Sequence, residues 1–154
     1  MKPNLILSPN DFSDASNQAA STAADFAAQF GAELCLVHIV PAIPKLPPGV
    51  SIFKEDEYQQ HLHAEAAQRL EQIARQFEDK GVKTRTLVGT ANDVGMELVR
   101  IAEHEKADMI VIATHGMTGW HRLAFGSVAE KVVRAASCPV LVIRAAAASQ
   151  AATS

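Results

Sequence analysis

The sequence predicts an α/β fold built on a doubly wound, parallel, five-stranded sheet. The prediction rests on the order of the apolar segments along the chain and on the way in which strands separated by helices can pair. Short apolar runs of strand length alternate along the 154 residues with longer segments whose apolar residues recur at helical spacing. Strands that are separated by helices cannot pair as hairpins, so right-handed crossovers are expected to place helices on both faces of a parallel sheet. No linker or internal repeat divides the chain. We therefore expect one domain over residues 2–144, followed by a small, polar, disordered tail over residues 145–154.

Composition argues against several classes of partner. The chain is 48% hydrophobic but only 5% aromatic, which predicts an aliphatic, alanine-rich core. A formal charge of -3 gives no electrostatic case for a nucleic-acid partner. Cys35 and Cys138 both lie in apolar runs that are expected to be strands, which favours buried thiols over a disulfide or a metal site. The first apolar run is too short for a signal peptide and no stretch approaches membrane-spanning length, so we expect a cytoplasmic protein without a membrane partner.

The first quarter of the chain contains a strand and a helix. The apolar run Asn4–Ser8 is the first predicted strand, and Pro9 ends it. A helix follows, whose first turn has Asp11 or Ser13 available as its cap. The helical spacing stops at Gly31, as expected for a residue just past a helix end.

A second strand, a long loop and the longest helix come next. The run Glu33–Val40 is apolar enough to be buried on both faces of a sheet. Residues 41–52 are rich in proline and form a longer connection than usual, either a lid, a partner surface or an excursion without a role. Residues 55–80 then form a helix that Gly81 ends. One stripe of this helix is expected to face the sheet: Tyr58, Leu62, Ala66, Leu70, Ile73 and Phe77.

The last part of the chain has the strand, glycine-bearing loop, helix and strand of a phosphate-binding crossover. After a third strand (82–88), a turn (89–93) and a short helix (94–102), an apolar run at 109–113 enters a loop that contains Gly116, Gly119 and Gly126. Glycine lets a backbone approach a polyanion closely, and the first turn of the next helix supplies unpaired N–H groups. Ser127 opens that helix and fits the capping pattern S-x-x-E with Glu130, so a helix cap is its alternative role. Residues 139–143 form the last strand.

A ligand site is expected where the winding of the sheet reverses, beyond the carboxyl ends of the first and fourth strands. With the order 3-2-1-4-5, residues 9–13 and 113–127 meet there. Asp11 offers a carboxylate for ribose hydroxyls or for a metal held through water, with helix capping as its alternative role. His115, His121 and Arg122 are candidate phosphate ligands, and the guanidinium of Arg122 suits phosphate best. The alternative for Trp120 to Arg122 is a plain exposed loop.

Sharper catalytic patterns are missing from the sequence. It contains no G-x-x-x-x-G-K-[ST], no G-x-G-x-x-G, no H-E-x-x-H and no G-x-S-x-G. No local pattern pairs a nucleophile with a base, so no catalytic residue is assigned. Any hydrolytic activity is expected to be slow.

Three segments together resemble the universal stress protein family over residues 4–144. They are LILSPNDFSDAS, LCLVHIV and ATHGMTGWHRLAFGSVAEKVVRAASCPVLVIR. The resemblance implies a Rossmann-like sheet of order 3-2-1-4-5, of the adenine nucleotide alpha hydrolase-like type, and a role in stress response. It also implies a homodimer formed through the last strand, here Pro139 to Arg144.

The same resemblance implies a nucleotide site. ATP-binding members carry G-x2-G-x9-G-[ST], of which Gly116, Gly126 and Ser127 match the last three elements, whereas Ala113 replaces the first glycine. By resemblance, the positions around the adenosine are Pro9, Asp11 and Ile39, and Val128 matches one beside the phosphates. The expected ligand is ATP or another adenine nucleotide, with or without Mg²⁺. The alternative is a dimeric interaction module of the same fold, in which Ala113 has closed the pocket.

Overall fold

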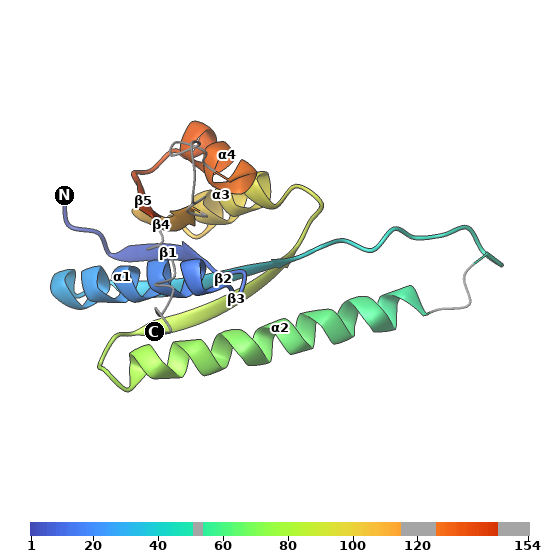
Figure 1. The fold of residues 1–154 in the computed structure, drawn as a ribbon, viewed down its shortest axis with the longest axis horizontal. Coiled ribbons are helices and arrows are strands. Elements are labelled where there is room, and N and C mark those ends of the chain that lie inside the picture. The colour runs from blue at the N-terminus through green and yellow to red at the C-terminus, as the bar shows by residue number, and fades with distance from the viewer. Residues whose placement is uncertain (51–53, 115–125, 145–154) are drawn as a thin grey trace, which may run out of the picture.

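The computed structural model describes residues 1–50, 54–114 and 126–144 (Figure 1). Its strands form one parallel sheet in the order β3-β2-β1-β4-β5. Both the predicted fold class and the predicted strand order are confirmed. The elements in chain order are β1 (Leu5–Pro9), α1 (Asp14–Phe30), β2 (Glu33–Val40), α2 (Glu55–Glu78), β3 (Thr84–Thr90), α3 (Val94–His104), β4 (Met109–Thr114), α4 (Ser127–Ala135) and β5 (Val140–Arg144).

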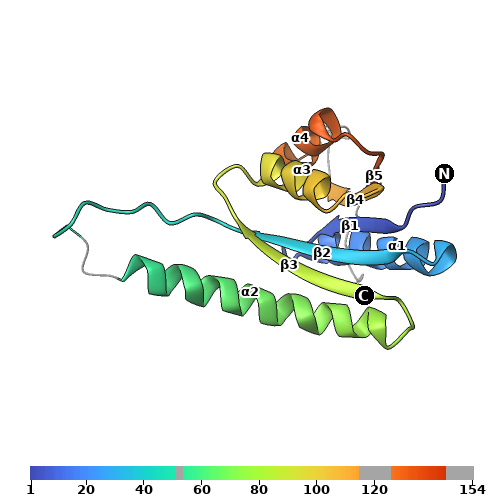
Figure 2. The same ribbon diagram turned by 180° about the vertical axis from the view of Figure 1, so that it is seen from behind.

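Helices cover both faces of the sheet, with α1 and α2 on one side and α3 and α4 on the other (Figures 1 and 2). Successive strand residues point to opposite faces, so each strand contributes to two cores. Ile6 and Leu36 pack with the alanines of α1, whereas Leu7 and Val37 pack with α3 and α4. The alanine side chains of α1 are small, which lets that helix lie close to the sheet.

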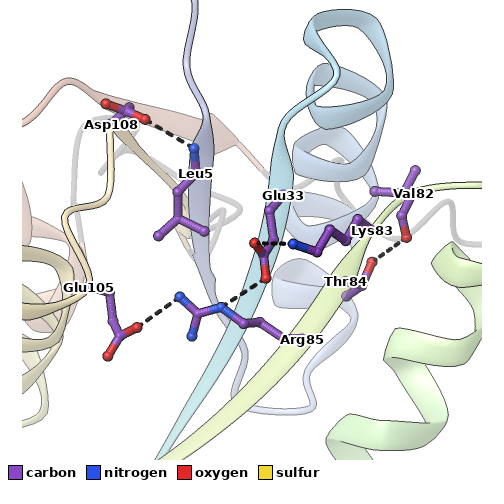
Figure 3. A network of polar contacts seen from close by, with 8 residues as sticks. All are labelled: Leu5, Glu33, Val82, Lys83, Thr84, Arg85, Glu105 and Asp108. Carbon is purple, nitrogen blue, oxygen red and sulfur yellow. Dashed lines mark hydrogen bonds and ion pairs between the residues drawn. The ribbon is translucent and has the colours of Figure 1, made fainter.

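Ion pairs join the elements at the amino-terminal edge of the sheet (Figure 3). The guanidinium of Arg85 on β3 lies 3.0 Å from Glu33 at the start of β2 and 2.8 Å from Glu105 at the end of α3. The carboxylate of Asp108 accepts hydrogen bonds from the backbone N–H groups of Asn4 and Leu5, at 2.7 and 3.0 Å. These contacts fix the amino-terminal ends of the strands. The ligand is expected at the opposite, carboxyl ends.

The two cysteines differ in their surroundings. Cys35 lies buried in β2, and burial raises the pKa of its thiol to about 11, so it is an unreactive core residue as predicted. Cys138 was predicted in a strand, which is wrong. It is half-buried in the turn that precedes β5.

Several predicted element limits are also corrected. β1 includes Pro9 rather than ending before it, and β3 runs to Thr90 instead of Val88. Tyr58 was predicted to face the core, but it is 55% exposed. The reason is that the first turns of α2 project beyond the sheet, so no strand covers them (Figure 1).

Residues 41–50 form an extended, largely exposed arm beside the projecting start of α2 (Figures 1 and 2). Gln59 holds the arm: its Oε1 accepts from the N–H of Ile43 at 2.9 Å, and its Nε2 donates to the carbonyl of Pro41 at 3.3 Å. The predicted loop is therefore confirmed over residues 41–50, and residues 51–53 lie outside the described part of the chain.

Candidate functional site at the reversal of the sheet

The sheet opens where its winding reverses, between β1 and β4. Their pairing covers Ile6 with Met109 and Leu7 with Ile110, and it goes no further. On the other side, β1 stays paired with β2 as far as Pro9. The carboxyl ends of β1 and β4 therefore diverge, at the place where ligands bind in open α/β sheets.

A hollow of about 360 Å³ occupies this opening. Its walls come from the β1–α1 loop, the end of β2, the end of β4 and the first turns of α1, α3 and α4. The lining residues are Pro9, Asn10, Asp11, Ser13, Ser16, Val37, His38, Ile39, Val94, Leu98, Ile112, Ala113, Gly126, Ser127, Val128 and Ala129. This volume lies in the usual range for a small-molecule pocket.

Seven of the predicted site residues lie in the described part of the chain, and all seven line this hollow: Pro9, Asp11, Ile39, Ala113, Gly126, Ser127 and Val128. The other two, Gly116 and Arg122, lie outside the described residues, as do His115, Gly119, Trp120 and His121. The topology thus brings together segments that lie far apart in the sequence.

Asn10 organises the wall formed by the β1–α1 loop, which sequence reasoning missed. Asn10 as a whole is 3% exposed. Its Oδ1 accepts from the N–H of Phe12 at 2.8 Å, and its Nδ2 donates to Oδ1 of Asn17 at 3.0 Å. Its backbone N–H donates to Val37 on β2 at 2.8 Å. Such satisfied buried polar groups fix a loop rigidly.

The ring of His38 forms part of the same wall. Its Nδ1 lies 2.7 Å from the carbonyl of Asn10, and a carbonyl only accepts, so the hydrogen is on Nδ1. In the neutral ring, Nε2 is then an acceptor. The ring stacks on Phe12 at a centroid distance of 4.4 Å, and the guanidinium carbon of Arg69 lies 4.0 Å from the centroid of the Phe12 ring. A chain of ring and cation contacts therefore links the hollow to α2.

Phe12 holds an unusual backbone conformation at this loop, with φ of +67°. Lys106 is the only other non-glycine residue with positive φ in the described ranges. This conformation costs roughly 1–2 kcal/mol for a residue with a side chain. The stacking on His38 and the contact with Arg69 offset that cost.

The hydrogen bonds show which of Asp11 and Ser13 caps α1. Ser13 is the N-cap of α1, since its hydroxyl accepts from the N–H of Ser16 at 3.2 Å. Asp11 is exposed, and its Oδ1 accepts from the N–H of Ser13 at 3.0 Å. The carboxylate of Asp11 thus stabilises the turn before the helix, and the residue also lies in the lining of the hollow.

The first turn of α4 forms the opposite wall, and here one prediction is wrong. Gly126, not Ser127, is the N-cap of α4. The carboxylate of Glu130 pairs with Arg134 at 2.9 Å instead of closing a capping box. The N–H groups of Ser127, Val128 and Ala129 have no acceptor within the helix, as at any helix start, and all three residues line the hollow.

Ala113 is compatible with its backbone position. It lies in β4, where it pairs with Ile143, and its φ is not positive. An alanine therefore introduces no backbone strain at this point. Its side chain packs against the core on the α1 face, and the hollow is present with this residue in its wall.

The remaining wall is apolar and comes from residues that the sequence did not single out. Val37, Val94 and Leu98 join the predicted Ile39 there. Their helical or strand spacing marked them only as core positions. What brings them to the hollow is the parallel register of the strands and the start of α3, which local patterns do not encode.

In the described part of the chain, no helix is long and apolar enough to cross a membrane.

Comparison with known proteins decides the family. The model of the universal stress protein family matches residues 4–144. The chain belongs to the universal stress protein family. Among curated members, universal stress protein MJ0531 of Methanocaldococcus jannaschii is 37% identical over 144 residues, covering 90% of this chain and 81% of that protein.

Solved universal stress proteins share the fold. The UspA protein of Lactobacillus plantarum has a TM-score of 0.77 at 26% identity, over 94% of this chain and 99% of that one. The Archaeoglobus fulgidus member, solved in complex with dAMP, has a TM-score of 0.64 at 25% identity, over 93% of this chain and 99% of that one.

Proposed function

We propose that this universal stress protein binds ATP or a related adenine nucleotide in the hollow between β1 and β4, and that it acts in stress response. One observation carries the proposal: every described residue that the family resemblance assigns to the nucleotide lines this single hollow. The relative from Archaeoglobus fulgidus, solved with dAMP, supports an adenine nucleotide as the ligand class.

The two ends of the hollow suit the two ends of a nucleotide. Ile39, Val37 and Leu98 offer an apolar surface for a base. At the other end, the first turn of α4 offers unpaired N–H groups and the positive end of the helix dipole. The proposed orientation therefore places the adenosine against β2 and the phosphates against Gly126, Ser127 and Val128. Mg²⁺ would enter as the counterion of the phosphates.

The β1–α1 loop supplies the polar contacts between these ends. Asp11 lies at the rim of the hollow, where its carboxylate can accept hydrogen bonds from ribose hydroxyls. No described residue is assigned as a general base, and the proposed activity is binding rather than turnover. A loss of slow ATP hydrolysis in Asp11→Ala, with the fold intact, would instead indicate an enzyme.

Mass spectrometry of the small molecules released on denaturing freshly purified protein tests the proposal, followed by calorimetric titration with Mg·ATP. We expect a stoichiometric adenine nucleotide, or an empty protein that binds one. An empty protein that gives no binding heat with any adenine nucleotide at millimolar concentration would rule the proposal out.

We further propose a cytoplasmic homodimer joined through β5. This strand lies at the edge of the sheet, and among the described residues its partner strand is β4, so the outer side of Val140 to Ile143 offers a strand edge for pairing with a second copy. Its apolar residues, Val140 to Ile143, are only half-buried. Analytical ultracentrifugation should give twice the chain mass of 16.5 kDa, and a monomer at micromolar concentration would contradict the dimer.

The exposed arm favours a second candidate function, an interaction module. Leu46 and Val50 on the arm and Tyr58 on α2 are at least half exposed, at 50, 64 and 55%. Such apolar side chains suit a protein partner. A partner whose affinity does not change with nucleotide, and drops when Leu46 and Val50 are replaced by serine, would support this function.

A further inference from the structure

A second hollow, of about 510 Å³, adjoins the first at the start of α4. The two share Val94, Ser127 and Val128 in their linings. The second hollow continues past these residues to Asn92, Asp93, Gly95 and Lys131. A ligand that fills the first hollow and is long enough can therefore extend along the start of α4 into the second.

Lys131 is the only lysine or arginine among the described residues that line the two hollows. It lies one turn after Ser127 on the same face of α4, and helical side chains tilt toward the amino terminus of their helix. Its ammonium is thus directed toward the end of α4 at which the proposed phosphates bind. In this orientation, each further phosphate group of the ligand lies closer to Lys131.

Asp93 now holds this ammonium, with Nζ 2.6 Å from Oδ2. The side chains of both residues are about half exposed, at 46% for Lys131 and 49% for Asp93. An exposed ion pair of this kind is weak and exchanges readily. The other carboxylate oxygen has a separate role, since Oδ1 caps α3 by accepting from the N–H of Met96 at 3.1 Å. Asp93 therefore stays anchored when the lysine leaves.

Gly95 sets the path of the lysine side chain. A Cβ at Gly95 would lie 2.9 Å from Cβ of Lys131 and 3.0 Å from its Cδ. The aliphatic part of Lys131 thus lies directly against the backbone of α3, which only a glycine permits. This contact leaves the ammonium as the mobile end of a fixed stem.

We infer that Lys131 determines how strongly the protein prefers a triphosphate to a monophosphate, by leaving Asp93 for the terminal phosphates. The inference rests on the proposed function, because it assigns a specificity residue within the same site. A nucleoside monophosphate ends near Ser127 and leaves the Lys131–Asp93 pair unchanged. A triphosphate reaches the second hollow and takes the ammonium.

Calorimetric titration of AMP, ADP and ATP in excess Mg²⁺ tests this with three variants. Lys131→Met keeps the apolar stem and removes the charge, so we expect ATP affinity to fall about tenfold and AMP affinity to change less than about twofold. Lys131→Arg should keep most of the preference. Asp93→Asn retains a good helix cap but releases the lysine, so ATP should bind several-fold more tightly and AMP equally well.

The outcomes separate the inference from the proposed function. If wild-type protein binds AMP and ATP, but Lys131→Met leaves their affinity ratio unchanged, the lysine does not distinguish phosphate number and the inference fails alone. A lower ATP affinity in Asp93→Asn would overturn it as well. If the wild type binds none of the three nucleotides, both are wrong. Thermal unfolding of each variant shows whether it is folded. If Lys131→Met does not fold, the ATP affinity of Asp93→Asn tests the inference by itself.

Discussion

The hydroxyl of Ser8 donates to the carbonyl of Val111 at 3.1 Å, in place of a backbone amide that the chain lacks. In the register that pairs Leu7 with Ile110, the carbonyl of Val111 would next receive the N–H of residue 9. Residue 9 is proline and has none. Pro9 thus ends the pairing of β1 with β4 and opens the hollow, while Ser8 satisfies the buried carbonyl that this leaves.

This replacement of a backbone amide by a side-chain hydroxyl predicts that the effects of Ser8→Ala and Pro9→Ala on stability are coupled. Ser8→Ala should lower the free energy of unfolding by about 1–3 kcal/mol, because the carbonyl of Val111 loses its donor. In a Pro9→Ala background the cost should be smaller, since that substitution restores the missing backbone N–H. Urea denaturation of the two single variants and the double variant measures the coupling, and strictly additive effects would contradict this account.

Phe12 offers a test of strain beside the hollow. Phe12→Ala removes the contacts with His38 and Arg69 but keeps a side chain at φ of +67°. Phe12→Gly removes the same contacts and the strain. We expect both variants to be less stable than the wild type, with the glycine variant more stable than the alanine variant by up to about 1 kcal/mol. Equal unfolding midpoints for the two variants would show that the loop carries no such strain.

Gly89 on β3 lies beside Ile39, which is part of the apolar wall of the first hollow. It pairs with Ile39 in the sheet, and a Cβ there would lie 2.8 Å from Cδ1 of Ile39 and 3.3 Å from Cδ1 of Ile101. Gly89→Ala should displace the end of Ile39 and weaken adenine nucleotide binding several-fold. The stability should change by less than about 1 kcal/mol, because only a flexible side-chain end must move. Shortening the side chain with Ile39→Val in the same protein should restore binding, and a failure to do so would contradict the proposed clash.

The ion pairs at the opposite edge predict a loss of stability in acid. Hydrogen bonds from His104 and Arg85 hold the pKa of Glu105 below its ordinary value of 4.5. A carboxyl with a depressed pKa stabilises the fold above the pKa of the unfolded chain, and this stability is lost as the pH falls through the lower, folded value. Arg85→Met should therefore cost about 1 kcal/mol or less near neutral pH, and this difference should shrink below pH 4.5.

Lys83→Met is the matched control for that experiment. Lys83 pairs with Glu33 at 3.0 Å, but its side chain is 78% exposed, so its loss should have almost no effect on stability. Denaturant unfolding of both variants from strongly acidic to neutral pH makes the comparison. An Arg85→Met cost that stays constant across this range would show that the pair with Glu105 contributes no pH dependence.

The sequence predicted the sheet well because its three central strands, β1, β2 and β4, are largely buried on both faces, and because its helices have clear apolar stripes. The predictions were wrong at positions whose exposure or helix boundary depends on tertiary structure. Tyr58 continues the stripe of α2, but the helix extends past the sheet that would cover it. Ser127 fits a capping pattern, but the chain enters α4 one residue earlier, at Gly126.

The candidate site was predictable only in part. Pro9 and Asp11 follow the first strand, so topology alone brings them to the reversal point. Asn10 and His38 could not be recognised in this way, since their importance comes from hydrogen bonds that form only in the folded chain. One of these joins the carbonyl of Asn10, just after β1, to the ring of His38 on β2. Lys131 gave no signal in the sequence, because its partner Asp93 lies at the start of another helix.

Calorimetric titration of Mg·ATP into the wild type and Gly126→Val tests the central claim most directly. The backbone at Gly126, with φ of −58° and ψ of 152°, accepts any L residue, so valine should leave the fold and the oligomeric state unchanged. We predict saturable binding by the wild type, and a loss of at least about tenfold in affinity when the valine side chain enters the phosphate end of the hollow. Equal ATP affinity in the two proteins, both folded, would contradict the assignment of this hollow as the nucleotide site.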